Sequence, residues 1–88
     1  MEYLIFSYPK CPNCESLKKA LEKTPFQGKE YSLVKKEGKV KIREYLKVIN
    51  RDKKGAIILP TLLMIDNEKV IKVINSPQEL QNWLRSKD

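Results

Sequence analysis

Near its amino-terminal end the chain reads Tyr3-Leu4-Ile5-Phe6-Ser7-Tyr8-Pro9-Lys10-Cys11-Pro12-Asn13-Cys14. The first four of these residues form a short continuous apolar run, which is typical of a strand buried on both faces. Further along, Cys14, Leu17 and Leu21 recur at helical spacing, so we predict a helix that begins near Pro12 and ends before Pro25. The cysteine pair therefore lies where a buried strand leads into a helix.

Cys11 and Cys14 are the only cysteines in the chain. A bridge between them would close a very small loop and restrict the unfolded chain little, so a purely structural disulfide is disfavoured. Unpaired N–H groups and the positive end of the helix dipole favour a thiolate over a thiol at this position. Lys10 and Lys18 should add to this effect, and Glu15 should oppose it. We expect Cys11 to be the more exposed, attacking thiolate and Cys14 the resolving thiol.

Two other interpretations of the pair stay open at this point. Cys14 alone is compatible with a small core residue, because it is in phase with Leu17 and Leu21. A zinc site needs four ligands, and this chain offers one cysteine pair and no histidine, so only a site bridging two chains would serve. The missing histidine also excludes hydrolase triads and histidine-bearing zinc sites.

Hydrophobic periodicity predicts the remaining elements. Residues 31–34 should form a second strand, and a second helix should follow Gly38. Its apolar stripe has helical spacing and comprises Ile42, Tyr45, Leu46 and Ile49. Segments 61–65 and 70–74 flank a turn and predict a hairpin. A capping box opens the last helix with Ser76, Pro77 and Glu79, and the buried stripe of that helix should comprise Leu80, Trp83 and Leu84.

The predicted order is strand, helix, strand, helix, strand, strand, helix. It predicts one α/β domain over residues 1–88: a right-handed parallel unit followed by an antiparallel hairpin, giving a mixed four-stranded sheet flanked by three helices. A length of 88 residues is too short for two cores. The longest apolar run, 56–60, is far too short to span a bilayer. Because the first residues lack the pattern of a secretory signal, we expect a cytoplasmic protein.

These residues resemble the glutaredoxin branch of the thioredoxin-like superfamily, over essentially the whole chain. The resemblance rests on a strand, Cys-Pro-x-Cys at a helix start, and Leu59-Pro60-Thr61 leading into a hairpin. It implies a thiol–disulfide oxidoreductase in which a cis Pro60 packs against the cysteines. In that family the residue before the proline, here Leu59, pairs with the substrate backbone. The expected substrate-binding residues are Lys10, Pro12, Asn13, Leu59, Pro60 and Thr61, together with Tyr8, Ser76 and Gln78.

The chain departs from that family in the stretch 75–79. Glutaredoxins that bind glutathione usually have a Gly-Gly pair followed by aspartate there, whereas this chain has Asn75-Ser76-Pro77-Gln78-Glu79. Asn13 replaces a common tyrosine, and Ile58 replaces a threonine. We expect a monomer with no tightly bound cofactor and no metal. The expected substrates are disulfide-containing proteins or glutathione mixed disulfides, with glutathione as a candidate co-substrate or a thioredoxin-reductase-type donor.

A basic binding module is the alternative function. The net charge is +7, and nine basic and three acidic residues lie between Lys35 and Lys54. Such a cluster can contact phosphates, but its lysines alternate with an apolar stripe, which favours a solvated helix face. The chain also lacks an aromatic-rich basic surface of the kind that stacks bases. A third hypothesis, implied by the resemblance, is an iron–sulfur cluster shared by two chains, with Cys11 and glutathione as ligands.

Overall fold

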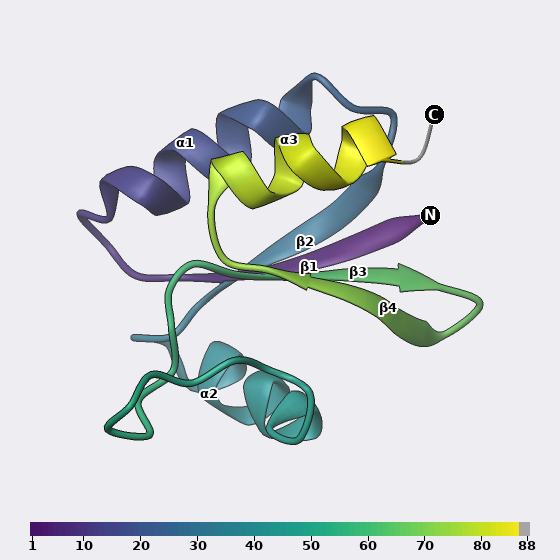
Figure 1. Cartoon of the computed structure of the whole chain (residues 1–88). Coiled ribbons are helices and arrows are strands. Elements are labelled where there is room, and N and C mark those ends of the chain that lie inside the picture. Colours follow the sequence, from purple (N-terminus) through teal and green to yellow (C-terminus); the bar gives the residue numbers. More distant parts are fainter. Residues whose placement is uncertain (87–88) are drawn as a thin grey trace.

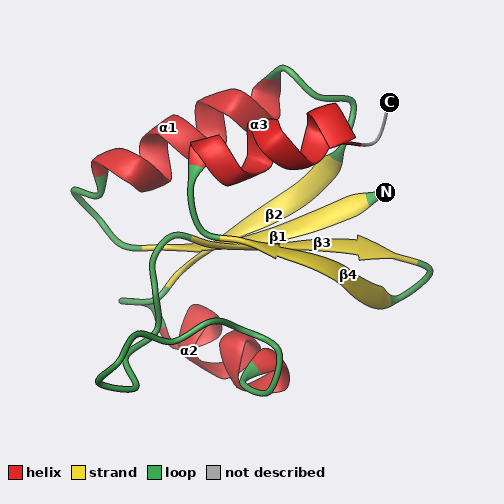
Figure 2. Cartoon of the chain, in the orientation of Figure 1, coloured by secondary structure: helices red, strands yellow, loops and turns green. Residues whose placement is uncertain are grey.

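The structure is a computed structural model and describes residues 1–86. Within these residues four strands form one sheet, ordered β2-β1-β3-β4 (Figures 1 and 2). The strands are β1 (Glu2–Ser7), β2 (Gln27–Ser32), β3 (Thr61–Asp66) and β4 (Lys69–Ile74). β1 pairs in parallel with β2 and antiparallel with β3, and β3 pairs antiparallel with β4. The predicted mixed sheet and its connectivity are therefore confirmed.

Helices cover both faces of this sheet. α1 (Pro12–Glu22) and α3 (Pro77–Ser86) lie on one face, and α2 (Lys36–Ile42) lies on the other (Figure 1). Successive residues of a strand point to opposite faces, so Ile5 packs with the α1 and α3 core and Phe6 with the α2 core. Both side chains are almost fully buried. The prediction that the first strand is buried on both faces is confirmed, and α1 has the predicted bounds.

The second strand lies earlier in the chain than predicted. β2 covers Gln27–Ser32, and most of its residues are exposed because it forms an edge of the sheet. Parallel backbone pairing with β1, from Glu2 opposite Gln27 to Ser7 opposite Ser32, sets its position. The apolar residue Leu33 follows the strand and enters the core below it. The prediction followed hydrophobicity, whereas an edge strand is held mainly by hydrogen bonds along its backbone.

The second helix begins earlier and ends sooner than predicted. α2 contains Gly38, whose Cα lies so close to the carbonyl of Ser32 that a Cβ there would clash. The helix ends at Ile42, and a short 3₁₀ turn (Arg43–Tyr45) follows it. Ile42 and Ile49 are buried as predicted, but Leu46 is exposed. Four apolar residues at helical spacing were therefore insufficient to sustain the helix past its second turn.

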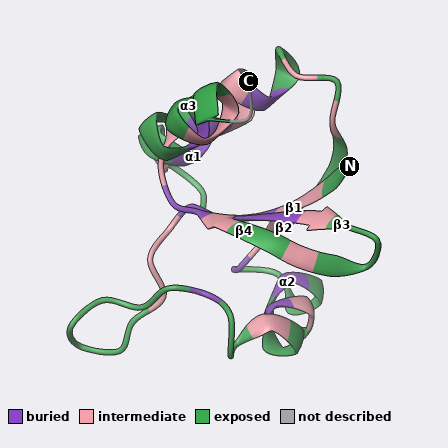
Figure 3. Cartoon of the chain, turned by 45° about the vertical axis from the view of Figure 1, so that its right-hand side comes forward, coloured by how far each residue is buried: buried purple, intermediate pink, exposed green. Residues whose placement is uncertain are grey.

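The carboxyl-terminal half matches the prediction closely. Asn67 and Glu68 form the hairpin turn and have positive φ angles of 52° and 66°. Ser76 caps α3, since its Oγ accepts the N–H of Glu79 over 3.1 Å. The reciprocal bond differs from the predicted capping box: the Glu79 carboxylate accepts the N–H of Asn75, not that of Ser76, over 2.8 Å. Figure 3 shows the buried residues gathered on the strands and on the helix faces turned towards them. Among residues 1–86, no helix has the length and apolar character needed to cross a membrane.

Candidate active site

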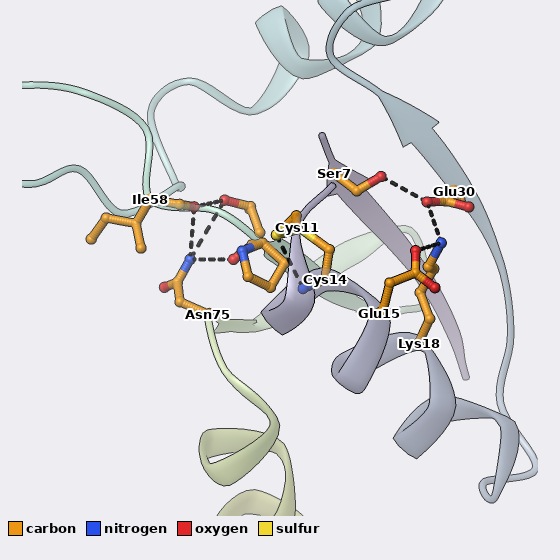
Figure 4. Close-up of a disulfide and its surroundings, with 10 residues drawn as sticks. Ser7, Cys11, Cys14, Glu15, Lys18, Glu30, Ile58 and Asn75 are labelled. Atoms are coloured by element: carbon orange, nitrogen blue, oxygen red, sulfur yellow. Dashed lines mark hydrogen bonds and ion pairs between the residues drawn. A yellow bond between two sulfur atoms is a disulfide. The ribbon is translucent and has the colours of Figure 1, made fainter. Parts of the chain in front are cut away.

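Cys11 and Cys14 form a disulfide at the amino-terminal end of α1 (Figure 4). Their Cα atoms are 5.2 Å apart. Cys11 is the N-cap residue, with extended backbone angles, and Pro12 occupies the start of the helix. Cys14 is fully buried, whereas Cys11 is partly exposed. The N-cap position thus leaves the Cys11 sulfur accessible from solvent, and the first turn of the helix places the Cys14 sulfur in the interior next to it.

The local hydrogen bonding favours negative charge on the Cys11 sulfur. Its Sγ accepts the backbone N–H of Cys14 over 3.1 Å. This N–H belongs to the first turn of α1, where N–H groups have no partner within the helix. The same end of the helix has a partial positive charge. A thiolate formed at Cys11 on reduction would therefore meet a backbone donor and a favourable dipole.

The segment before β3 forms the second part of the site. The Leu59–Pro60 peptide bond is cis, as the resemblance implied, and Pro60 is fully buried. Thr61 is also fully buried, and its hydroxyl donates to the carbonyl of Ile58 over 2.6 Å. Figure 4 shows the segment containing Ile58 close to the disulfide. The Thr61 side chain thus holds this segment together through its bond to Ile58. Leu59 is half-buried and lies between Ile58 and the fully buried Pro60.

An asparagine between β4 and α3 holds this segment from behind. The Nδ2 of Asn75 donates to the carbonyl oxygens of Ile58 and Pro60, at 3.2 and 3.0 Å, and lies 3.5 Å from the Oγ1 of Thr61. Its Oδ1 accepts from the Nδ2 of Asn50 over 2.7 Å. Asn75 is only 9% exposed. A buried amide with all of its groups paired is a rigid support, because breaking any of these bonds would leave a polar group unsatisfied.

A charged network lies on the other side of the disulfide (Figure 4). Ser7 Oγ donates to the Glu30 carboxylate over 2.7 Å, and Lys18 Nζ donates to the same oxygen over 2.9 Å. Lys18 also forms an ion pair of 2.7 Å with Glu15. The Ser7 hydroxyl and then Lys18 lower the pKa of Glu30, while Glu15 and then Glu30 raise the pKa of Lys18. Lys18 is thus paired with two carboxylates. We had expected its charge to favour the thiolate at the cysteine pair.

The other predicted site residues fall into two groups. Tyr8, Lys10, Pro12 and Asn13 are all exposed and flank Cys11 in the chain. Lys10 has a positive φ of 57°, which turns the backbone just before the N-cap. The predicted residues around α3 lie at its start: the hydroxyl of Ser76 is engaged as a cap, and Gln78 is exposed. Exposure therefore favours the residues next to Cys11 as the surface that meets a substrate.

Sequence reasoning missed the polar residues that support the site from a distance. Neither Asn50 nor Glu30 was singled out, and Asn75 was noted only as a departure from a glutathione motif. Their side-chain partners lie 12 to 25 positions away in the chain. An isolated asparagine or glutamate in a sequence has no periodicity that would reveal such a partner. A helix cap beside Asn75 was the only local signal that this residue lies at a fixed point of the backbone.

A sizeable hollow lies away from the disulfide. It has a volume of about 450 Å³ and lies at the opposite ends of β1 and β2, where Tyr3, Gly28 and Lys41 contribute to its lining. No cysteine lines it, and disulfide exchange needs only an accessible sulfur at a surface. We therefore place the site at the disulfide. Within residues 1–86 no group of three or more His, Cys, Asp or Glu side chains could hold a metal ion.

Two solved structures are similar to this chain over nearly its whole length. A malarial protein superposes with a TM-score of 0.63 at 16% sequence identity, covering 97% of this chain and 93% of its own. Thioredoxin 1 from the thermophilic eubacterium Thermosipho africanus superposes with a TM-score of 0.60 at 14% identity, covering 99% of this chain and 98% of its own. No family model matches the sequence, and no curated protein matches it.

These similarities show that the chain has a thioredoxin-like α/β fold. At such low sequence identity the comparison extends to the fold alone. Independently of it, the chain places a Cys-x-x-Cys disulfide at the start of α1, close to a cis-proline segment. The combination of this fold with a closely spaced cysteine pair suggests thiol–disulfide redox chemistry.

Proposed function

We propose that the protein is a thiol–disulfide oxidoreductase in which Cys11 is the nucleophile and Cys14 the resolving cysteine. The observation that supports this most directly is the asymmetry of the pair. Cys11 is partly exposed and its sulfur accepts an N–H at the helix start, whereas Cys14 is fully buried beside it. An external disulfide can therefore reach Cys11, and Cys14 can attack only from within the protein.

The proposed reaction consists of two exchanges. The thiolate of Cys11 attacks one sulfur of the substrate disulfide, forms a mixed disulfide and releases the other substrate sulfur as a thiolate. Cys14 then attacks the Cys11 sulfur and forms the Cys11–Cys14 bridge, and its proton passes to the departing substrate sulfur, which leaves as a thiol. The substrate gains two electrons, and the cysteine pair loses two. A donor dithiol, or two molecules of glutathione, returns these electrons to the pair.

We extend this proposal to the electron donor and to the substrate. A glutaredoxin type, with glutathione as donor or co-substrate, is the expectation from the resemblance. The 75–79 stretch favours a protein donor of the thioredoxin-reductase type, because Asn75, Ser76 and Glu79 are already engaged with one another and with neighbouring segments. We propose disulfide-containing proteins as substrates, a monomeric form, and the reducing cytoplasm as the compartment. Neither a tightly bound cofactor nor a metal is part of the proposed mechanism.

Two serine variants test the proposed function. Cys11→Ser should abolish reduction of a peptide disulfide by the pre-reduced protein. Cys14→Ser should instead accumulate a mixed disulfide on Cys11, visible by intact-mass spectrometry as an increase by the mass of the peptide thiol less two hydrogens. Ser16→Ala, which replaces an exposed serine of the same helix by alanine, serves as the control. A Cys11→Ser variant as active as the wild type would exclude the proposed chemistry.

The donor is identified by titrating the oxidised protein. Reduced glutathione and a thioredoxin-reductase system are supplied separately, and the two thiol states are separated by mass after alkylation. Efficient reduction by glutathione would support a glutaredoxin type. Reduction by the reductase system alone would support a thioredoxin type on the same fold. Absence of absorption from an iron–sulfur cluster in protein purified without oxygen would remove the cluster hypothesis.

A further inference from the structure

The backbone of Leu59 differs from that of its neighbours. Within residues 1–86 neither its N–H nor its C=O makes a hydrogen bond. On one side, the carbonyl of Ile58 accepts from Thr61 and Asn75; on the other, the carbonyl of Pro60 accepts from Asn75. Leu59 is half-buried and belongs to the segment that Figure 4 shows close to the disulfide. A single residue next to the site therefore has both of its main-chain groups unpaired.

Asn75, together with Thr61, fixes the direction of the Leu59 N–H. In a trans peptide unit the C=O and the following N–H point in opposite directions. Since the Ile58 carbonyl points at Asn75 Nδ2 over 3.2 Å, the N–H of Leu59 points away from Asn75. The bond of 3.0 Å to the Pro60 carbonyl anchors the segment on the far side of Leu59. The Asn75 amide thus bonds the carbonyls on both sides of Leu59, whose own N–H and C=O have no partner among residues 1–86.

The backbone of Asn75 is fixed independently of its side chain. Its N–H donates to the carboxylate of Glu79 in the first turn of α3, and Ser76 caps that helix. Asn50 holds the other end of the Asn75 amide from the loop that precedes the cis-proline segment. Removing the side-chain amide should therefore loosen the 58–60 segment, which keeps the bond from Thr61 to the Ile58 carbonyl, while leaving the start of α3 in place.

We propose that Asn75 is a positioning residue for polypeptide substrates: by holding the carbonyls of Ile58 and Pro60, it presents the main-chain groups of Leu59 to an extended chain beside the substrate disulfide. This inference rests on the proposed function and deepens it by naming a residue that positions the substrate-binding segment. Pairing with Leu59 requires a peptide backbone next to the reacting sulfur. A small disulfide without peptide groups gains nothing from this arrangement, so Asn75 should matter for peptide disulfides and not for small ones.

The test is a comparison of two substrates in Asn75→Ala. Initial rates are measured for a disulfide-bonded peptide and for hydroxyethyl disulfide, with the wild type, with Asn75→Ala and with two controls. Asn50→Ala removes the donor to Asn75 Oδ1 and leaves the Nδ2 group of Asn75, which bonds Ile58 and Pro60, in place. Asn82→Ala alters an exposed asparagine of α3. Loss of ordered main-chain hydrogen bonds should lower kcat/KM for the peptide about tenfold, mainly through KM. The value for hydroxyethyl disulfide should stay within about twofold in every variant, and Asn50→Ala should show an intermediate effect on the peptide.

The outcomes separate this inference from the proposed function. Equal losses on both substrates in Asn75→Ala, in a protein that retains its fold by circular dichroism, would overturn the positioning role alone. A wild type that reduces neither substrate would overturn the proposed function, and this inference with it. A selective loss on the peptide, with the reduction potential of the cysteine pair unchanged, would support the inference.

A second measurement applies even where Asn75→Ala does not fold. In the mixed disulfide between Cys14→Ser and the peptide, hydrogen exchange is followed by NMR at the Leu59 amide. We expect rapid exchange in the free protein and at least about tenfold slower exchange in the mixed disulfide, because the N–H then has a partner. Equal exchange in the two states would overturn the inference without any change to Asn75.

Discussion

The backbone N–H of Cys14 donates to the Sγ of Cys11 over 3.1 Å. One cysteine thus supplies the hydrogen bond that stabilises charge on the other, while its own side chain is fully buried. A helix start is suited to this division of roles, because the N-cap side chain faces the open N–H groups and the residue three positions later faces the core. Because Cys11 precedes Pro12 as the N-cap and Cys14 follows it within the first turn, Cys11 is the exposed cysteine and Cys14 the buried one.

The Glu30 carboxylate should make the free energy of unfolding fall at acidic pH. Its pKa lies below its ordinary value of 4.5 because Ser7 and then Lys18 donate to the ionised form. A pKa lowered by folding contributes stability above the unfolded value and loses it as the pH falls through the folded value. From pH 6 to below the folded pKa, the wild type should therefore lose more stability than Glu30→Gln. Since Glu30 is partly exposed, we expect a difference of at most about 1 kcal/mol.

Urea unfolding at a series of pH values between 6 and 2.5 measures this difference. Glu22→Gln is the matched control, because Glu22 is an exposed carboxylate of α1. That control should follow the wild type over the whole range. If Glu30→Gln also follows the wild type, the hydrogen bonds to Glu30 do not contribute to stability.

Gly38→Ala should destabilise the protein. A Cβ at this position would meet the carbonyl of Ser32 at the end of β2. Moving α2 away from the strand should cost about 1–3 kcal/mol, and over most of this range the cost exceeds the roughly 1 kcal/mol that alanine gains over glycine in a helix. Lys39→Ala, at the next and exposed position of the same helix, should be neutral or slightly stabilising. Thermal unfolding of both variants distinguishes the cases, and a Gly38→Ala protein as stable as Lys39→Ala would show that α2 is not packed this closely.

Lys10→Glu should weaken the reaction with acidic substrates. Lys10 is exposed and directly precedes Cys11, so its charge lies within a Debye length of about 8 Å of an approaching peptide at physiological salt. With a disulfide peptide flanked by aspartates, kcat/KM should fall about two- to tenfold. With a lysine-flanked peptide it should rise. Both effects should fade at high salt.

Lys23→Glu provides the control for this charge change. Lys23 is exposed at the opposite end of α1 from the cysteines, so the net charge changes equally while the field at Cys11 changes little. Equal effects of the two variants would mean that net charge alone governs the rate. A response of Lys10→Glu that is the same for acidic and basic peptides would exclude steering by this lysine.

Local patterns predicted most of the elements correctly. The apolar run at β1, the cysteine spacing at α1, the turn at Asn67 and Glu68, and the cap at Ser76 each depend on neighbours within about four residues. Those elements lie where predicted. The errors concern β2 and α2, whose positions depend on distant contacts: β2 on its register with β1, and α2 on the approach of Gly38 to Ser32. Hydrophobicity is a poor guide for an edge strand with most of its side chains in solvent.

The sequence by itself determined the order of the elements and the junction that places Cys11 before, and Cys14 within, the first turn of α1. These depend on helical periodicity, on proline at a helix start and on capping, all of which act between near neighbours. The tertiary structure alone decided that Asn75 holds Ile58 and Pro60, 17 and 15 residues away, and that Ser7 reaches Glu30, 23 residues away. Such bonds form only after the sheet has brought its strand ends together, and no local pattern in the chain encodes them.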